Sequence, residues 1–377
     1  MAPTPDAYWL ALRRVRGVGP RIARLLLDSF RSPDLIFAAR ESDLVQTGIP
    51  RPTAHNIATF SDFDPIEKEL CELPRIGARL IRWSDAEYPA NLRQIADPPP
   101  YFFLRGALDG ADPKSIAVVG ARAASDAGRR MAQRLGLEFA ARDFMVVSGL
   151  ARGIDSEAHQ GALDGGGRTV AVMGCGIDVI YPPENRKLAE AIVAGGGGII
   201  SELPVGTPPV AENFPTRNRL ISGLCLGVVI VEAAEKSGSL ITARMALEQN
   251  RQVFAVPGSP LTGRTRGSNR LLKEGARLVD CVEDVIEELA PQLGTVTARV
   301  KPEPEESIGE ETVPATGVIE PNETNDILVQ LKGSERLHVD SIIEGTGLNA
   351  QTVLKLLLEL ELGGLVSQHP GKLFSLI

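Results

Sequence analysis

Short apolar runs alternate with amphipathic stretches between residues 113 and 290. Runs such as Ser115–Val119 and Thr169–Met173 are apolar on both faces, whereas Ala127–Ala141 has helical periodicity. Strands that are apolar on both faces and separated by helices belong to a parallel sheet covered on both sides. The other predicted strands are Phe144–Val147, Gly198–Ser201, Val228–Val231, Val253–Val256 and Arg277–Val279, with a further helix at Leu240–Gln249. The pattern therefore predicts an α/β domain.

The preceding segment has a different periodicity. Residues 1–70 show the spacing of short helices, including Ala7–Val15 and Arg21–Phe30, which flank the turn Arg16-Gly-Val-Gly-Pro20. A Gly-rich turn between two helices resembles a helix-hairpin-helix, whose amides can contact a nucleic-acid phosphate; a tight helical connector is the alternative. Residues 75–112 form a bridge with two possible strands, Arg79–Trp83 and Tyr101–Arg105.

The last part of the chain predicts a linker followed by a small domain. Residues 291–322 are rich in Pro and Glu and poor in large apolar groups, which indicates a disordered acidic linker. Residues 323–377 recover periodicity and have the order of a winged helix. Its elements are three helices (Ile327–Leu331, Val339–Glu344 and Ala350–Leu362) and a hairpin (Leu365–Gln368 and Leu373–Leu376). The expected domains are thus 1–70, 75–290 and 323–377.

The net charge of −8 is concentrated near the C-terminus. Residues 291–377 hold 6 basic and 13 acidic residues, whereas residues 213–277 hold 10 basic and 4 acidic ones. A local basic patch can bind a polyanion although the total charge is negative. The four cysteines are scattered, which argues against a zinc site, and no apolar run approaches the roughly 20 residues that span a bilayer. With no signal peptide at the start, we expect a cytoplasmic protein.

Two Gly-rich loops follow neighbouring predicted strands and are the strongest functional signal. In the first, Gly120 and Arg122 follow Ser115–Val119. Strand, turn and helix N-terminus together form an anion cradle, because free amides and the helix dipole converge there. Arg122 stands where a dinucleotide fingerprint would need glycine, so it favours a phosphate contact over a dinucleotide site. Pairing of Arg122 with a local carboxylate is the alternative.

The second loop contains Ser148, Gly149 and Gly153, and Asp155 follows it. The small residues leave room for a ligand, and Gly153 permits a tight turn. Asp155 and His159 are four residues apart, which could suggest an acid–base pair. We favour a structural interpretation, in which Asp155 caps the following helix and His159 packs or hydrogen-bonds.

A third group combines an aromatic ring with positive charge. Phe214 offers a stacking face, Arg217 and Arg219 offer charge, and Asn218 offers an amide. This combination suits single-stranded nucleic acid, whose bases are free to stack. A core Phe beside two surface arginines is the alternative. Glu232, at the end of a strand, could be catalytic, but a role in fixing a turn or holding Arg219 is favoured.

Several segments together resemble the DNA-processing protein A (DprA/Smf) family of bacteria. The matches span about residues 75–280 and are Val119-Gly-Ala-Arg122, Ser148-Gly-Leu-Ala-Arg-Gly-Ile-Asp155, Tyr181-Pro182 with Glu184-Asn185, Ser201-Glu202, Phe214-Pro-Thr-Arg-Asn-Arg219, Ser237-Gly-Ser-Leu-Ile-Thr-Ala243 and Val256-Pro-Gly258. The ends resemble the family's optional sterile-alpha-motif-like domain and its winged helix. The resemblance implies an extended Rossmann domain that binds single-stranded DNA without catalysis, dimerises and loads the RecA recombinase during natural transformation.

By motif matching, the residues expected at the phosphate and DNA site are Gly120, Arg122, Ser148, Gly149, Gly153, Asp155, Phe214, Arg217, Asn218 and Arg219. Neither a catalytic residue, a metal nor a cofactor is expected. Two alternatives stay open: an enzyme that cleaves nucleotides, and a nucleotide-sensing module. The enzyme is disfavoured because Ser237-Gly-Ser-Leu-Ile-Thr-Ala243 lacks the glycine run and glutamate of such enzymes. The predicted third helix of the winged helix has Lys355 against Glu359 and Glu361, which favours a protein contact over DNA.

Overall fold

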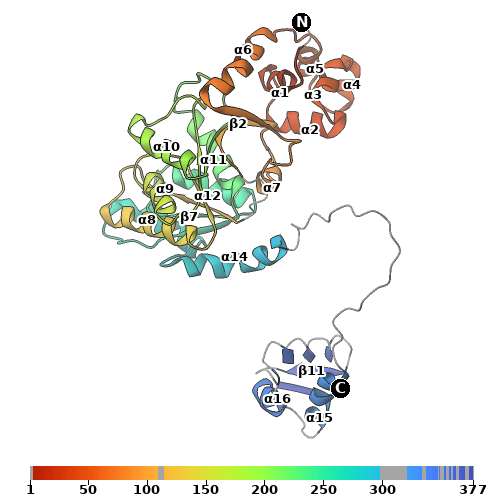
Figure 1. The fold of residues 1–377 in the computed structure, drawn as a ribbon, viewed down its shortest axis with the longest axis vertical. Helices are drawn as coiled ribbons and strands as arrows, with labels where there is room; N and C mark the ends of the chain where they lie inside the picture. Colours follow the sequence, from red (N-terminus) through yellow and green to blue (C-terminus); the bar gives the residue numbers. More distant parts are fainter. Residues whose placement is uncertain are drawn as a thin grey trace. The chain divides into compact units, whose positions relative to one another are not determined.

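The computed structural model describes residues 3–108, 114–297, 321–332 and 337–346, together with 348, 352–353, 356–357, 360–361, 365–369 and 373–376. The chain divides into two compact units, Met1–Pro302 and Glu303–Ile377. The first unit contains an α/β sheet domain and the N-terminal helices, and the second contains a small mixed domain (Figure 1). The α/β fold class expected from the sequence is confirmed.

A nine-stranded sheet organises the first unit, in the order β1-β2-β6-β5-β4-β3-β7-β8-β9. The strands from β3 onward run parallel, while β1 and β2 are antiparallel additions beside β6. Their bounds are β1 Ala78–Arg82, β2 Tyr101–Gly106, β3 Ser115–Val119, β4 Met145–Ser148, β5 Thr169–Val172, β6 Gly198–Ser201, β7 Gly227–Ile230, β8 Gln252–Ala255 and β9 Arg277–Leu278. The strand order reverses between β3 and β7, where ligands of open α/β sheets bind.

Helices cover both faces of the sheet, as the apolar strands require. Alternate strand residues point to opposite faces: Ile116 and Val118 of β3 pack with α8, α9 and α14, whereas Ala117 and Val119 pack with α7, α11, α12 and α13. The bounds are α7 Ala90–Arg93, α8 Asp126–Ala140, α9 Ile154–Asp164, η2 Pro183–Asn185, α10 Arg186–Ala194, α11 Asn213–Leu224, α12 Ser239–Glu248, η3 Gly263–Thr265, α13 Arg266–Lys273 and α14 Val282–Thr297.

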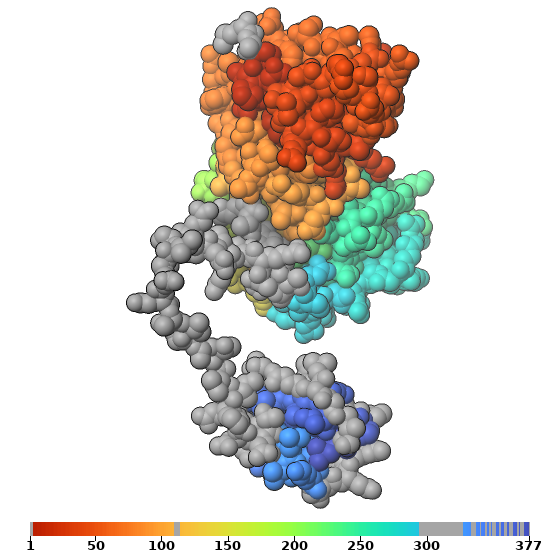
Figure 2. Space-filling view, turned by 90° about the vertical axis from the view of Figure 1, so that its right-hand side faces the viewer, coloured from red at the N-terminus to blue at the C-terminus, as the bar shows by residue number. Residues whose placement is uncertain are grey.

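The N-terminal helices share a hydrophobic core with one end of the sheet. They are α1 Pro5–Arg14, α2 Pro20–Phe30, α3 Pro33–Ala38, α4 Glu41–Gln46, α5 Arg51–Ala58, α6 Asp64–Glu72 and η1 Leu73–Ile76. Leu10 and Leu26 belong to the same buried cluster as Tyr101 and Phe103 of β2. The space-filling view shows these helices, in red and orange, packed closely against the rest of the unit (Figure 2). The predicted segment 1–70 is therefore packed onto the sheet domain within one compact unit.

The predicted linker begins too early in the sequence. Helix α14 continues to Thr297 with Pro291 inside it, because its apolar face, including Leu289, packs on the sheet. Residues 291–297 are thus helical, 298–320 lie outside the described residues, and 321–322 already belong to α15.

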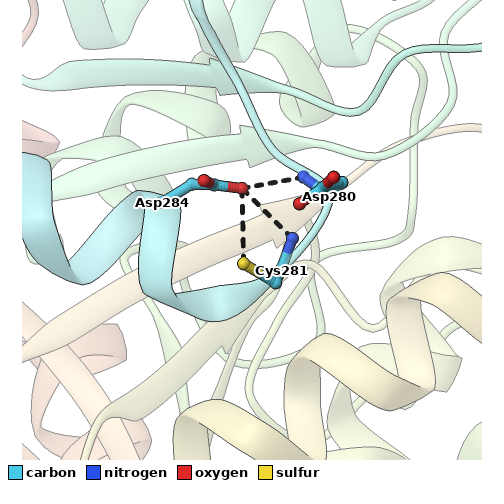
Figure 3. A group of neighbouring side chains, drawn as sticks. All are labelled: Asp280, Cys281 and Asp284. Atoms are coloured by element: carbon cyan, nitrogen blue, oxygen red, sulfur yellow. Dashed lines mark hydrogen bonds between the residues drawn. The ribbon is translucent and has the colours of Figure 1, made fainter.

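A cluster of Asp280, Cys281 and Asp284 precedes and begins helix α14 (Figure 3). The Asp284 carboxylate accepts hydrogen bonds from the backbone amides of Asp280 at 3.0 Å and Cys281 at 3.2 Å. These bonds lower the pKa of Asp284, because they favour its charged form. Satisfying free amides at a helix start is a capping role, so these contacts explain the cluster without a metal.

The second unit has the elements of a winged helix. They are α15 Pro321–Lys332, β10 Leu337–His338, α16 Val339–Thr346, β11 Val366–His369 and β12 Leu373–Leu376. The strands form a sheet in the order β10-β12-β11. The predicted third helix, Ala350–Leu362, is only partly described, and its residues 352–353, 356–357 and 360–361 are helical. Lys355 and Glu359, on which its predicted charge balance rests, lie outside the described residues.

Among the residues that the structure describes, no helix combines the length and apolar character needed to cross a lipid bilayer.

Candidate nucleic-acid interface

A cavity of about 670 Å³ opens at the reversal point of the sheet, beyond the C-terminal ends of β3 and β7. Three cationic side chains, those of Arg122, Arg217 and Lys236, line it, against one acidic side chain, that of Asp155. Its apolar wall includes Tyr181 and Phe214. The remaining lining residues are Val119, Gly120, Ala121, Ala151, Pro209, Ala211, Pro215, Asn218, Ile221, Ala234, Ser237, Gly238, Ser239, Ile241 and Thr242.

The first Gly-rich loop forms one wall of this cavity. A Cβ on Gly120 would lie 2.7 Å from Ile154 Cγ1 and 2.9 Å from the Glu232 carbonyl oxygen, so only glycine allows helix α9 and the end of β7 to approach this closely. The following peptide is held in place, because Ala121 N–H donates to Glu232 O at 2.7 Å. This fixed turn presents the exposed side chain of Arg122 to the cavity.

Arg122 lies against an aromatic ring. Its guanidinium carbon is 5.4 Å from the centroid of the Phe214 ring, and the Tyr181 ring lies 5.7 Å from the same ring at 48°. A cation near an aromatic face is favourable by about 0.5–1 kcal/mol at exposed sites. The predicted neighbourhood of Phe214 and Arg122 is therefore present in the structure, with Tyr181 as a second ring.

Two buried residues with ionisable side chains form hydrogen bonds to the backbone of the second Gly-rich loop. Asp155 accepts hydrogen bonds from Gly149 N–H at 3.1 Å and Ala151 N–H at 3.4 Å. Arg217 donates to the Gly149 carbonyl at 3.1 Å and also to the Val172 carbonyl. The backbone N–H and carbonyl of Gly149 are thus both hydrogen-bonded to buried side chains. A Cβ at this position would lie 2.6 Å from Arg217 Nη2.

Burial disfavours the charged forms of both residues. It raises the pKa of the Asp155 carboxyl, an effect that the nearby Arg217 opposes. It lowers the pKa of Arg217 to about 10, an effect that Asp155 opposes. Arg217 therefore stays positively charged at neutral pH, and its charge favours the ionised form of Asp155.

Asp155 does not cap helix α9 as predicted. The N-cap is Gly153, which makes no side-chain cap bond, and Asp155 binds amides of the preceding loop instead. Gly153 has φ of +74°, and a Cβ there would lie 2.4 Å from the Ala121 carbonyl oxygen. The missing side chain of Gly153 thus allows the two Gly-rich loops to contact each other, and its positive φ agrees with the predicted tight turn.

Four of the predicted site residues do not line the cavity: Ser148, Gly149, Gly153 and Arg219. Ser148 is buried and donates to the Val118 carbonyl at 2.7 Å. Arg219 is 5% exposed; it forms an ion pair with Glu202 and donates to the Asp97 carbonyl at 2.9 Å. Both arginines of this segment lie on helix α11, and the sequence alone did not show that the helix buries Arg219 on the side away from the cavity lining.

The two candidate catalytic groups have structural roles. His159 is fully buried, its Nδ1 lies 2.6 Å from Thr169 Oγ1, and burial lowers its pKa to about 3. Glu232 is 3% exposed and accepts from Ser125 N–H at 3.2 Å, which orders the start of helix α8. The structural interpretations of both are confirmed, and Glu232 fixes a turn rather than holding Arg219.

The turn after β7 belongs to the cavity although it was not among the predicted site residues. Lys236, Ser237 and Ser239 line the cavity at and just before the start of α12. The sequence signal was a third strand, Gly-containing turn and helix start. Together with Tyr181, these residues complete a site that combines cationic side chains and a helix start with two aromatic rings, groups of the kind that bind phosphates and bases elsewhere.

Comparison with known proteins identifies related sequences over the whole chain. Residues 79–290 match the family model "DNA recombination-mediator protein A", residues 313–372 a DprA winged helix domain, and residues 10–60 a SAM-like helix-hairpin-helix tandem. Protein Smf of Synechocystis sp. is 35% identical, and the alignment covers 98% of both chains.

Solved structures show the same fold. DNA processing protein A from Streptococcus pneumoniae superposes with a TM-score of 0.66 at 34% identity, over 76% of this chain and 99% of that one. DNA processing protein A from Helicobacter pylori, a structure described for its single-stranded DNA binding mode, has a TM-score of 0.50 at 29% identity, over 57% of this chain and 97% of that one.

Proposed function

The chain belongs to the DNA recombination-mediator protein A family, and on this premise we propose that its cavity binds single-stranded DNA without catalysing a reaction. The contacts are proposed to be made by Arg122 and Lys236 with phosphates, and by Phe214 and Tyr181 with a base. Asn218 supplies an amide to the same bound nucleotide. Gly120, Gly149, Gly153 and Asp155 shape the loops around it, and Arg217 holds them.

One observation supports this proposal above the others: a cation and an aromatic pair lie together in a cavity at the reversal point of the sheet. The Arg122 guanidinium is next to the Phe214 ring, and exposed Lys236 and the start of α12 line the same cavity. A single strand offers both a phosphate and an unstacked base within one nucleotide, whereas a duplex hides the faces of its bases. The arrangement therefore favours single-stranded DNA.

A nucleotide-cleaving enzyme is the rival. Such an enzyme would need a carboxylate or imidazole free to act on the bound nucleotide. Glu232 is occupied by Ser125, and His159 is buried against Thr169. Asp155 lines the cavity, but it already accepts two backbone amides. These contacts support binding as the function.

We further propose the cellular role that the family implies: protection of incoming single strands and their transfer to RecA during natural transformation. Action as a homodimer in the cytoplasm is part of the same proposal. A RecA-loading assay tests it, with RecA filament formation on strands coated by a single-strand binding protein as the readout. Stimulation by this protein is expected, and its absence with a DNA-binding preparation would contradict the role in loading.

The binding function is tested by fluorescence anisotropy with a labelled single strand, its duplex and a mononucleotide, each titrated over salt. We expect the single strand to bind more tightly than the other two. Equal or tighter binding of the mononucleotide would favour a nucleotide sensor. Release of free base from a nucleotide, abolished by Glu232→Gln, would establish the enzyme instead.

Arg122→Ala is the first variant for the same assay. Because Arg122 is exposed and is proposed to bind a phosphate, its loss should weaken binding to all single-stranded sequences alike. It should also reduce the slope of log affinity against log salt by about 0.7. Arg142→Ala is a control for the loss of an exposed arginine away from the cavity, since Arg142 lies before the start of β4, at the opposite edge of the sheet, where it is paired with Glu283. Unchanged affinity in folded Arg122→Ala would contradict the assignment.

A further inference from the structure

The loop between β8 and α13, residues 257–265, is joined to the first Gly-rich turn by a hydrogen bond from Arg264 to the Ala123 carbonyl, and it carries positive charge together with the start of α13. We propose that a single strand bound in the cavity continues across this loop, with Arg264 and Arg266 binding the phosphates of nucleotides outside the cavity. This inference rests on the proposed function and extends its site. It assigns a second nucleotide subsite to a segment with no residue in the cavity lining.

The loop and the start of α13 are hydrogen-bonded close to both turns that contribute cations to the cavity. Arg264 donates from Nη1 to the Ala123 carbonyl at 3.0 Å, next to Arg122 of the first turn. Gly267 N–H donates to the Ala233 carbonyl at 2.8 Å, at the start of the turn that contains Lys236. A strand leaving the cavity between these turns therefore meets this loop.

The loop is exposed but internally fixed. Asn269 donates to the Gly258 carbonyl at 2.8 Å and accepts from Gly258 N–H at 3.0 Å, while Thr265 Oγ1 donates to the Ser259 carbonyl at 2.7 Å. A Cβ on Gly258 would lie 2.2 Å from the Thr265 side chain, so the chain crosses itself closely at this point. Such bonds hold the backbone that presents the two arginines, and fewer conformations are lost when a ligand binds.

The charge of this segment suits a polyanion. Residues 257–273 contain Arg264, Arg266, Arg270 and Lys273 and no acidic residue. Arg270 is paired with Glu274, whereas the ion pairs found among the described residues include neither Arg264 nor Arg266. Both of these side chains are exposed. They are thus available to phosphates, in line with the first turn and the Lys236 turn.

An apolar side chain lies in the same loop. Leu261 is 94% exposed, the most exposed of the large hydrophobic residues in the described parts of the chain. A leucine beside two arginines offers a surface for an unstacked base next to its phosphates. A duplex would offer phosphates but no free base, so Leu261 favours a single strand here also.

Oligonucleotide length separates the two subsites experimentally. Oligothymidylates of about 4 and about 12 nucleotides, both within the range of known single-strand site sizes, are titrated against the full chain by anisotropy. Arg264→Ala/Arg266→Ala should bind the short oligonucleotide as the wild type does. Its affinity for the long one should fall about tenfold at low salt, and the salt slope by about 1.4, the value for two phosphates.

Two further variants make the outcome decisive. Arg266→Ala alone leaves the Arg264 contact with Ala123 intact, and should still show a length-dependent loss, with a slope change of about 0.7. Arg142→Ala should change the affinity for neither oligonucleotide. Wild-type affinity of Arg266→Ala and of the double variant for the long oligonucleotide would overturn this path alone. Failure of the wild type to bind either length would instead refute the proposed function, and the path with it.

Discussion

Arg217 provides the sharpest test of how the site is built, because it combines a cavity position with a structural role. Arg217 is 5% exposed, and its guanidinium donates to the carbonyls of Gly149 and Val172. Arg217→Met keeps much of the side-chain volume but removes the charge and both donors. Two buried carbonyls then lose a donor, and the buried carboxylate of Asp155 loses its neighbouring cation.

The expected loss of stability follows from these contacts. Removing one partner of a buried charged pair costs about 3–5 kcal/mol, because the remaining charge is left uncompensated. A domain of ordinary stability, about 5–15 kcal/mol, would remain folded but be clearly weakened. Part of the loss should be recovered in Arg217→Met/Asp155→Asn, since the neutral amide no longer needs a cation. We expect this recovery to be about 1–3 kcal/mol.

Urea denaturation followed by circular dichroism measures both values, and anisotropy with a labelled single strand measures binding. Arg217→Met should lower affinity through a displaced Gly149 loop while leaving the salt slope near the wild-type value. Arg122→Ala should do the reverse, with a smaller slope and a free energy of unfolding lowered by no more than about 1 kcal/mol, the contribution of its contact with the Phe214 ring. If Arg217→Met changes stability by less than about 1 kcal/mol and lowers the slope, Arg217 binds phosphate directly and the reasoning is refuted.

Three other expectations concern stability. His159 has a pKa of about 3 in the folded protein, whereas the unfolded residue titrates near 6.5. Below pH 6.5 the unfolded chain binds a proton that the folded protein excludes, so the free energy of unfolding is highest above pH 6.5 and falls by about 2 kcal/mol by pH 5. Urea titrations should show this loss in the wild type and not in His159→Phe, and equal slopes would contradict it. Arg219→Met should destabilise by about 3–5 kcal/mol without changing the affinity of the folded protein for single strands; weaker binding with normal stability would instead place Arg219 on the DNA. Gly153→Ala places a Cβ 2.4 Å from a carbonyl oxygen and should lower the free energy of unfolding by about 3 kcal/mol. Gly166 has a similar φ of +69° but open space around it, so Gly166→Ala should cost only about 1 kcal/mol. Similar losses for the two variants would exclude the close contact as the cause.

The sheet could be predicted from the sequence because its strands are apolar on both faces. Such runs have few alternatives to a covered parallel sheet, and the predicted strands match the observed ones to within a residue or two. The glycines of the two loops were equally informative, since Gly120 and Gly153 occupy positions where a side chain would collide with neighbouring backbone. Both signals depend on residues close together in the chain, so they can be recognised in a single sequence.

The roles of the charged residues could not be predicted in the same way. Arg217 and Arg219 are two residues apart on helix α11, and burial of each depends on partners distant in the sequence, Asp155 and Glu202. The same holds for helix α14, where tertiary packing overrides the Pro- and Glu-rich composition that predicted a linker from residue 291. These tertiary contacts join residues far apart in the sequence, so composition and spacing alone do not predict them.

The distribution of compensated and uncompensated cations sets how strongly binding should depend on salt. Arg219 is neutralised by Glu202, and Arg217 is stabilised by the nearby Asp155, so neither adds a free charge to the surface. Arg122 and Lys236 are exposed at the cavity, which gives a salt slope of about 1.4 for short strands that reach only these two. Arg264 and Arg266 would raise it to about 2.8 for longer strands. The increase in slope with length therefore counts the cations along the path, in a protein whose net charge is −8.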